Sequence, residues 1–117
     1  MSESFDTLFQ KALAAAEKLR PLGMHNYEST VRWPRFYVFQ SGASFGGGQQ
    51  YFMATEANKN GKTWKGVFVE TRPGLRRPGK AKHGNMRPPR LGEPAGYKPI
   101  FPQDIPPEVI ERFREKG

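Results

Sequence analysis

The chain has 117 residues, the length of a single domain, and its 13 glycines and 11 prolines favour a compact centre with loop-rich flanks. It contains no cysteine, which excludes disulfides, thiolate metal sites and cysteine nucleophiles. No apolar run approaches the roughly 20 residues of a membrane span, and the first residues lack the pattern of a secretory signal. We therefore expect a soluble, cytoplasmic protein that has no membrane partner.

The net charge of +8 is concentrated in one segment. Residues 71–92 contain seven of the 19 basic residues and no acid, so the rest of the chain holds 12 basic residues against 11 acids. The seven are Arg72, Arg76, Arg77, Lys80, Lys82, Arg87 and Arg90. Such a segment attracts phosphates over about 8 Å at physiological salt. The sequence predicts a polyanionic partner, and the alternative is a solvated loop that keeps the protein in solution.

The first predicted element is a helix that begins after Ser4 and ends at Pro21. Ser4 is a favourable N-cap, and Asp6 lies in the first turn, where negative charge is stabilising. Apolar residues recur at spacings of three and four from Phe5 onwards, so one face of the helix is expected to pack on a sheet.

Three strands are predicted next, because the apolar period changes to two and aromatic and β-branched residues become frequent. They cover residues 35–40, 49–55 and 63–71. A glycine-rich loop joins the first pair, and the turn sequence of residues 58–61 joins the second. These signals predict a three-stranded antiparallel meander with aromatic residues on both faces, preceded by a short extended piece near residues 29–32.

The remainder is predicted to be a loop and a short helix. Residues 71–96 are rich in proline, which restricts the chain to extended or turn conformations, and we expect a basic loop or arm there. The final helix is expected to have Asp104 as its cap and Pro106 or Pro107 in its first turn. Its apolar stripe consists of Val109, Ile110 and Phe113.

The predicted fold is therefore α+β and forms one domain. Residues 1–70 supply the N-terminal helix and the meander, residues 71–96 the basic arm, and residues 97–117 the C-terminal segment with its short helix.

Aromatic residues on or beside the strands suggest how bases could be held. Trp33, Tyr37 and Trp64 are the stacking candidates, with Arg35 and Lys65 beside them. A base stacked on such a ring contributes about 1–3 kcal/mol, and the alternative is that the rings are ordinary core. Together with the arm, these residues predict a non-enzymatic nucleic-acid-binding protein. We expect single-stranded DNA or RNA because no recognition helix is evident.

Two other functions fit the sequence. The first is a protein-interaction module or small inhibitor that docks its Arg- and Pro-rich arm on an acidic partner, such as a nucleic-acid enzyme. The second is a small metal-independent ribonuclease that uses Glu70 with His83 or His25. No catalytic residue is assigned otherwise. We expect no cofactor and no metal site, because two isolated histidines without cysteines do not form a zinc motif. The oligomeric state stays open.

Overall fold

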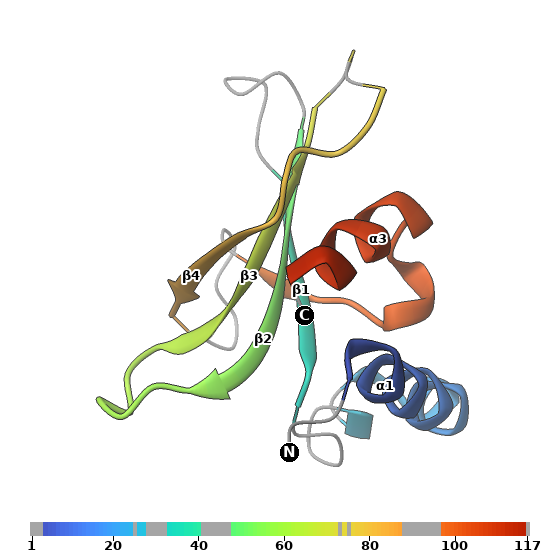
Figure 1. The fold of residues 1–117 in the computed structure, drawn as a ribbon. Coiled ribbons are helices and arrows are strands. Elements are labelled where there is room, and N and C mark those ends of the chain that lie inside the picture. Colours follow the sequence, from blue (N-terminus) through green and yellow to red (C-terminus); the bar gives the residue numbers. More distant parts are fainter. Residues whose placement is uncertain are drawn as a thin grey trace.

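The computed structural model in Figure 1 describes residues 4–24, 26–27, 33–40, 48–72, 74, 76–87 and 97–116. Its regular elements, in chain order, are α1 (Phe5–Leu19), the 3-10 helix η1 (Arg20–Leu22), β1 (Arg35–Gln40), β2 (Gln49–Ala57), β3 (Trp64–Thr71), β4 (Lys82–Met86), β5 (Lys98–Pro99), the 3-10 helix η3 (Pro102–Asp104) and α3 (Pro107–Lys116). The predicted α+β class is confirmed. The extended piece predicted near residues 29–32 lies outside the described residues.

Helix α1 begins and ends where the sequence predicts. The side chain of Ser4 accepts a hydrogen bond from the Thr7 backbone N–H at 3.3 Å, which satisfies one of the free amides of the first turn. At the other end the helix tightens into η1, which contains Pro21 and closes at Gly23 with a φ of 99°. No helix in the described part of the chain is long and apolar enough to cross a membrane.

The sheet is larger than the predicted three-stranded meander. It has five strands in the order β4-β3-β2-β1-β5, and all neighbouring strands are antiparallel. The residues predicted as strands, apart from Thr63, lie in β1, β2 and β3, and β2 continues to Ala57. The additional strands are the two edges of the sheet.

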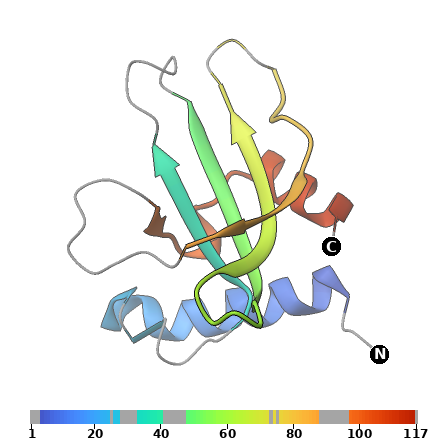
Figure 2. The ribbon, with the colours of Figure 1, turned by 90° about the vertical axis from the view of Figure 1, so that its left-hand side faces the viewer.

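Strand β4 corrects the prediction that the whole basic segment is a loop. Gly84 pairs with Gly66 of β3, and the Phe68 ring lies so close to Gly84 that a Cβ there would be 2.4 Å from it. Because Gly84 has no side chain, β4 can approach the Phe68 ring, and the ring covers the glycine backbone. In Figure 2, β4 passes in front of the face formed by β1 to β3, and buried Met86 packs against this face.

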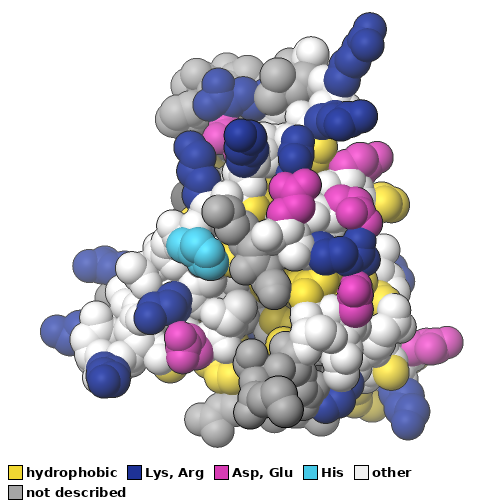
Figure 3. Space-filling model, in the orientation of Figure 1, with side chains coloured by type: hydrophobic (Ala, Val, Ile, Leu, Met, Phe, Trp, Pro, Cys, Tyr) yellow, Lys and Arg dark blue, Asp and Glu magenta, His cyan; other side chains and the backbone are white. Residues whose placement is uncertain are grey.

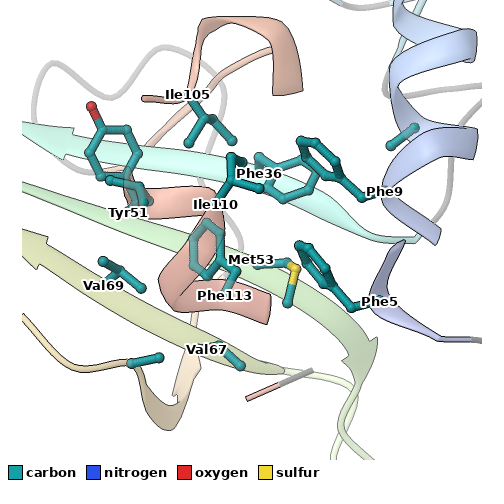
Figure 4. Close-up of a cluster of buried hydrophobic side chains, with 13 residues drawn as sticks. Phe5, Phe9, Phe36, Tyr51, Met53, Val67, Val69, Ile105, Ile110 and Phe113 are labelled. Carbon is teal, nitrogen blue, oxygen red and sulfur yellow. The ribbon is translucent and has the colours of Figure 1, made fainter. Parts of the chain in front are cut away.

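One face of the sheet packs on both long helices, which lie on the same side of it in Figure 1. Figure 4 shows how this core is assembled. The ring of Phe36 on β1 meets Phe9 of α1 edge-on at 5.8 Å and Phe113 of α3 at 6.1 Å. Phe113 is completely buried, as are most apolar residues of this face. The prediction that α1 packs its apolar face on the sheet is thus confirmed, and α3 completes the layer.

The other face carries a second, aromatic cluster. Tyr37, Phe52, Ala54 and Met86 are buried in it, and Trp33, Trp64, Phe68 and Tyr97 are partly buried against them. The Tyr97 hydroxyl donates to Gln50 Oε1 at 2.5 Å. Most rings of this face therefore belong to a small core beneath β4 and Tyr97.

Helix α3 starts at Pro107, within the predicted first turn, and buries the predicted stripe of Val109, Ile110 and Phe113. The prediction for Asp104 was wrong in detail. This residue ends η3, and its carboxylate accepts from Arg20 at 2.9 Å, which ties the end of α1 to the C-terminal segment.

Candidate functional site

The basic segment is anchored to the rest of the fold on both sides. After β3 the chain turns back, and the Gly79 N–H donates to the Glu70 carbonyl oxygen at 2.8 Å. Arg112 of α3 donates from Nε to the Pro78 carbonyl oxygen at 3.1 Å. These two bonds hold residues 78–79 between the end of β3 and the outer face of α3. Arg77 and Lys80 therefore flank a backbone segment that is bonded on both sides.

Six of the seven predicted phosphate-binding residues are described, and the side chains of all six are exposed. We call them the basic track, which consists of Arg72, Arg76, Arg77, Lys80, Lys82 and Arg87. Arg90 lies outside the described residues. In Figure 3 the Lys and Arg side chains gather where β3 leads into β4, and Asp and Glu side chains group beside them over α3. Other Lys and Arg side chains are scattered over the same view, so the basic track is distinguished by its density of cations at the end of the sheet where β3 leads into β4.

The cations of the track differ in their partners. Arg72 Nε is 2.6 Å from Glu70 Oε1, and both groups are largely exposed, so this pair contributes little to stability. No ion pair or hydrogen bond is found for the side chains of Arg76 and Arg77 within the described parts of the chain. These two arginines are the track residues best prepared to bind an external anion.

The track follows the length of β3. Arg72 comes directly after the last residue of β3, whereas Met86 of β4 pairs with Trp64, its first residue, and Arg87 follows. The eight residues of β3 make seven steps of about 3.3 Å, so its ends are about 23 Å apart. A flexible polyanion could contact several cations at once along this distance, whereas a single small anion could not.

A cavity of about 250 Å³ opens at the arginine end of the track. We call it the arginine cavity. Its lining comes from the paired ends of β2 and β3, from the turn after β3 and from the start of α3: Gln49, Tyr51, Thr71, Arg72, Arg76, Arg77, Pro78, Pro106, Glu108 and Val109. Three arginines therefore border one small space.

The floor of the arginine cavity is buried and neutral. Tyr51 is 4% exposed and Val109 is fully buried. Burial raises the pKa of the Tyr51 hydroxyl, which donates to Gln49 Oε1 at 2.7 Å. Among the described residues of the lining, Glu108 is the only acid, and it lies in the first turn of α3, where a negative charge favours the helix. The lining carries three arginines and one glutamate, a formal net charge of +2, so the cavity favours an anion.

The predicted stacking residues divide into accessible and inaccessible rings. Trp33 and Trp64 are partly exposed and meet edge-on with centroids 5.5 Å apart, and the Arg35 guanidinium lies 5.4 Å from one ring and 5.3 Å from the other. We call these three residues the tryptophan cluster. Tyr37 packs beside Trp64 but is only 1% exposed, so a base cannot stack on it in this conformation. Its burial corrects the expectation that all three rings are available.

Lys65 does not join the tryptophan cluster. Its Nζ lies 3.7 Å from Glu56 Oε1 across the β2–β3 pair, and strand alternation places it on the opposite face from Trp64. A bulge between Ala54 and Glu56 brings the two charges together.

The residues considered for a ribonuclease are not brought together. His83 pairs with Val67, and Glu70 lies three residues further along β3, so alternation assigns the two side chains to opposite faces. The carboxylate of Glu70 is also engaged by Arg72. His25 lies outside the described residues. Within the part of the chain that the structure describes, no three acidic or histidine side chains are grouped to hold a metal ion.

Comparison of the chain with protein-family models, with curated proteins and with solved structures found no match. The case for a function therefore depends on the chain's own surface.

Sequence reasoning located the basic track and missed the arginine cavity. The cavity joins residues that are far apart in the chain, such as Gln49, Thr71 and Glu108. The sequence indicated only that Gln49 and Thr71 lie at the ends of predicted strands and that Glu108 lies at the start of a predicted helix. Once β2 and β3 are paired, Gln49 and Thr71 face each other, so correct register would have brought together four of the ten lining residues, Gln49, Tyr51, Thr71 and Arg72.

Proposed function

We propose that this protein binds single-stranded nucleic acid without cleaving it, and that the basic track holds the phosphates. The observation that carries the proposal is the track itself: six exposed cations, with no acid in the sequence from 71 to 92, follow one strand for about 23 Å. Extended polyanions are bound by such rows of cations because each contact releases a condensed counterion.

The tryptophan cluster supports a preference for single strands. It lies where β4 ends, beside the Arg87 end of the track, and presents two partly exposed rings with a cation between them. Unpaired bases have free faces that stack on such rings, whereas the bases of a duplex are already stacked. Helix α3 offers no basic face for the major groove, because Arg112 and Arg114 form ion pairs with Glu115 and Glu111 of the same helix.

Charge-neutral variants test the track. Replacing Lys80, Lys82 and Arg87 together by Gln removes three exposed cations without touching the buried core. The matched control replaces Lys11, Lys18 and Lys116 by Gln, three cations of α1 and α3, the helices that cover the opposite face of the sheet. Both variants lower the net charge from +8 by the same amount.

The expected result is that the track variant binds an oligothymidylate or oligouridylate at least about tenfold more weakly than the wild type, in fluorescence anisotropy at about 50 mM salt. The control should lose much less. Equal losses in the two variants would show that binding depends on overall charge alone, and absence of binding by the wild type would refute the proposal.

Intrinsic fluorescence tests the tryptophan cluster without a label. Both tryptophans of the chain belong to it, so their emission reports on this site alone. Stacked bases should quench the emission on binding, and Trp64→Ala, which removes one of the two rings, should reduce affinity by the equivalent of about 1–3 kcal/mol. Binding that leaves the emission unchanged would remove the cluster from the interface and leave the track in place.

A further inference from the structure

The arginine cavity differs from the rest of the track in shape. The other cations of the basic track lie on an exposed edge of the sheet, where a nucleic-acid strand can continue past them on both sides. At the cavity, Arg76 and Arg77 border a space whose floor is closed by Tyr51 and Val109. An internal phosphodiester has chain on both sides and must lie across the mouth of such a space, whereas a chain end can enter it with its phosphate first.

The charge of the cavity also suits a chain end. A terminal phosphate monoester carries a charge of about −1.5 to −2 at pH 7 and presents three strong acceptor oxygens. An internal diester carries one charge and has two free oxygens. Arginine donates in a planar fork that matches phosphate oxygens, and Arg76 and Arg77 have no partner among the described residues. The small volume of about 250 Å³ leaves room for a phosphate and its sugar but excludes a folded structure.

We propose that the arginine cavity binds the terminal phosphate monoester of a single strand and so fixes which end of the strand meets the track. The inference rests on the proposed function, because the strand that leaves the cavity follows the basic track towards the tryptophan cluster. Glu108 limits the affinity of the cavity, because its carboxylate lies in the same lining and repels a dianion.

The test compares one oligonucleotide sequence in three forms, with a 5′-phosphate, with a 3′-phosphate and with hydroxyls at both ends. The full-length protein should bind one phosphorylated form at least about tenfold more tightly than the hydroxyl form, which is the effect of a charged hydrogen-bonding pair. The other phosphorylated form serves as the control for added charge and decides between the two ends.

Variants then assign the preference to the cavity. Arg76→Gln with Arg77→Gln should reduce the ratio between the phosphorylated and hydroxyl forms to about one, because it removes both unpaired guanidinium groups. Lys80→Gln with Lys82→Gln is the matched control: it should weaken all forms alike and keep the ratio. Glu108→Gln should raise the ratio, and this change in the opposite direction cannot come from misfolding.

The pH dependence gives a further readout. The second pKa of a phosphate monoester is about 6, so the preference should grow from pH 5 to pH 7 as the end gains its second charge. A preference that is independent of pH would contradict recognition of a dianion.

The outcomes separate this inference from the proposed function. Equal binding of all three forms overturns the end-binding inference while nucleic-acid binding stands. If no oligonucleotide binds, the proposed function fails, and a nucleoside monophosphate titration followed by NMR then tests the cavity alone. Shifts in wild type that disappear in the Arg76→Gln, Arg77→Gln variant would support a phosphate site, and absence of shifts would overturn it.

Discussion

The position of β4 depends on two glycines that face each other across the β3–β4 pair, and adding one methyl group to each gives different results. A Cβ on Gly66 would lie 2.0 Å from the Met53 carbonyl oxygen, which belongs to the backbone of the central strand β2. A Cβ on Gly84 would lie 2.4 Å from the Phe68 ring, a side chain that can rotate. The contact of Gly66 with the β2 backbone cannot relax unless the strands move apart, whereas the contact of Gly84 can relax by rotation of the Phe68 ring.

Overpacking of a well-packed core costs about 1–3 kcal/mol. We expect Gly66→Ala to reach or exceed the upper value, about 3 kcal/mol, and Gly84→Ala to cost about 1 kcal/mol. At roughly 4 °C per kcal/mol for a domain of this size, the melting temperature should fall by about 12 °C in the first variant and about 4 °C in the second. The total stability of such a domain is about 5–15 kcal/mol, so the larger loss is readily measured.

The assay is thermal and urea unfolding followed by circular dichroism. Gly79→Ala is the matched control, because a Cβ there would meet only the Glu70 carbonyl oxygen at an ordinary 3.6 Å. Its melting temperature should stay level or rise slightly, since alanine restricts the unfolded chain. If Gly66→Ala is as stable as Gly79→Ala, the close approach of β3 to β2 is wrong; if Gly84→Ala is as stable as Gly79→Ala, the contact of β4 with the Phe68 ring is wrong.

The remaining predictions concern the core, the turn that supports β4, and alkaline pH. Phe113→Ala should cost about 3–5 kcal/mol in urea unfolding, because the ring is fully buried against the sheet; a loss below about 1 kcal/mol would contradict that packing. Asn58→Ala should cost about 1–2 kcal/mol, since its amide nitrogen donates to both Thr63 Oγ1 at 2.7 Å and Asn85 Oδ1 at 2.8 Å; an unchanged urea midpoint would show that the bridge is not formed in solution. Burial raises the pKa of Tyr97 from 10 to about 12, so the folded state holds this proton more tightly than the unfolded state, and its contribution to stability is present below pH 10 and lost as the pH rises to 12. Tyr97→Phe should therefore reduce the fall in the urea midpoint over this range, and an identical fall in both proteins would refute the assignment.

Much of the fold could be predicted because local signals agreed with the tertiary structure. Helix α1 has an N-cap residue, apolar residues at helical spacing and a proline just after its end. Strands β1 and β3 are rich in aromatic and β-branched residues. Strand β4 could not be predicted from its sequence, KHGNM, which lacks branched and aromatic residues. Its pairing is decided by Gly66 and Phe68 on another strand. Strand β5 is two residues long and is fixed only by its partners Tyr37 and Val38.

The candidate site was predictable in its charge and unpredictable in its geometry. The absence of Asp and Glu between residues 71 and 92 identifies the cations of the basic track from the sequence alone. Alternation assigns Tyr37 to a face, but it cannot say that Met86 and Tyr97 cover this face, and so it overestimates the number of exposed rings. The arginine cavity needs the turn after β3 to lie against the start of α3, a contact between segments about 30 residues apart that no local pattern encodes.

The salt dependence of oligonucleotide binding tests the central claim most directly. The track contributes six exposed cations, and each phosphate contact on a single strand changes the logarithm of the binding constant by about −0.7 per logarithm of salt concentration. A wild-type slope of about −4 on a single-stranded oligothymidylate is therefore expected, falling to about −2 in the Lys80, Lys82 and Arg87 glutamine variant. A slope near zero, or one that is the same in the two proteins, would contradict phosphate binding by the basic track.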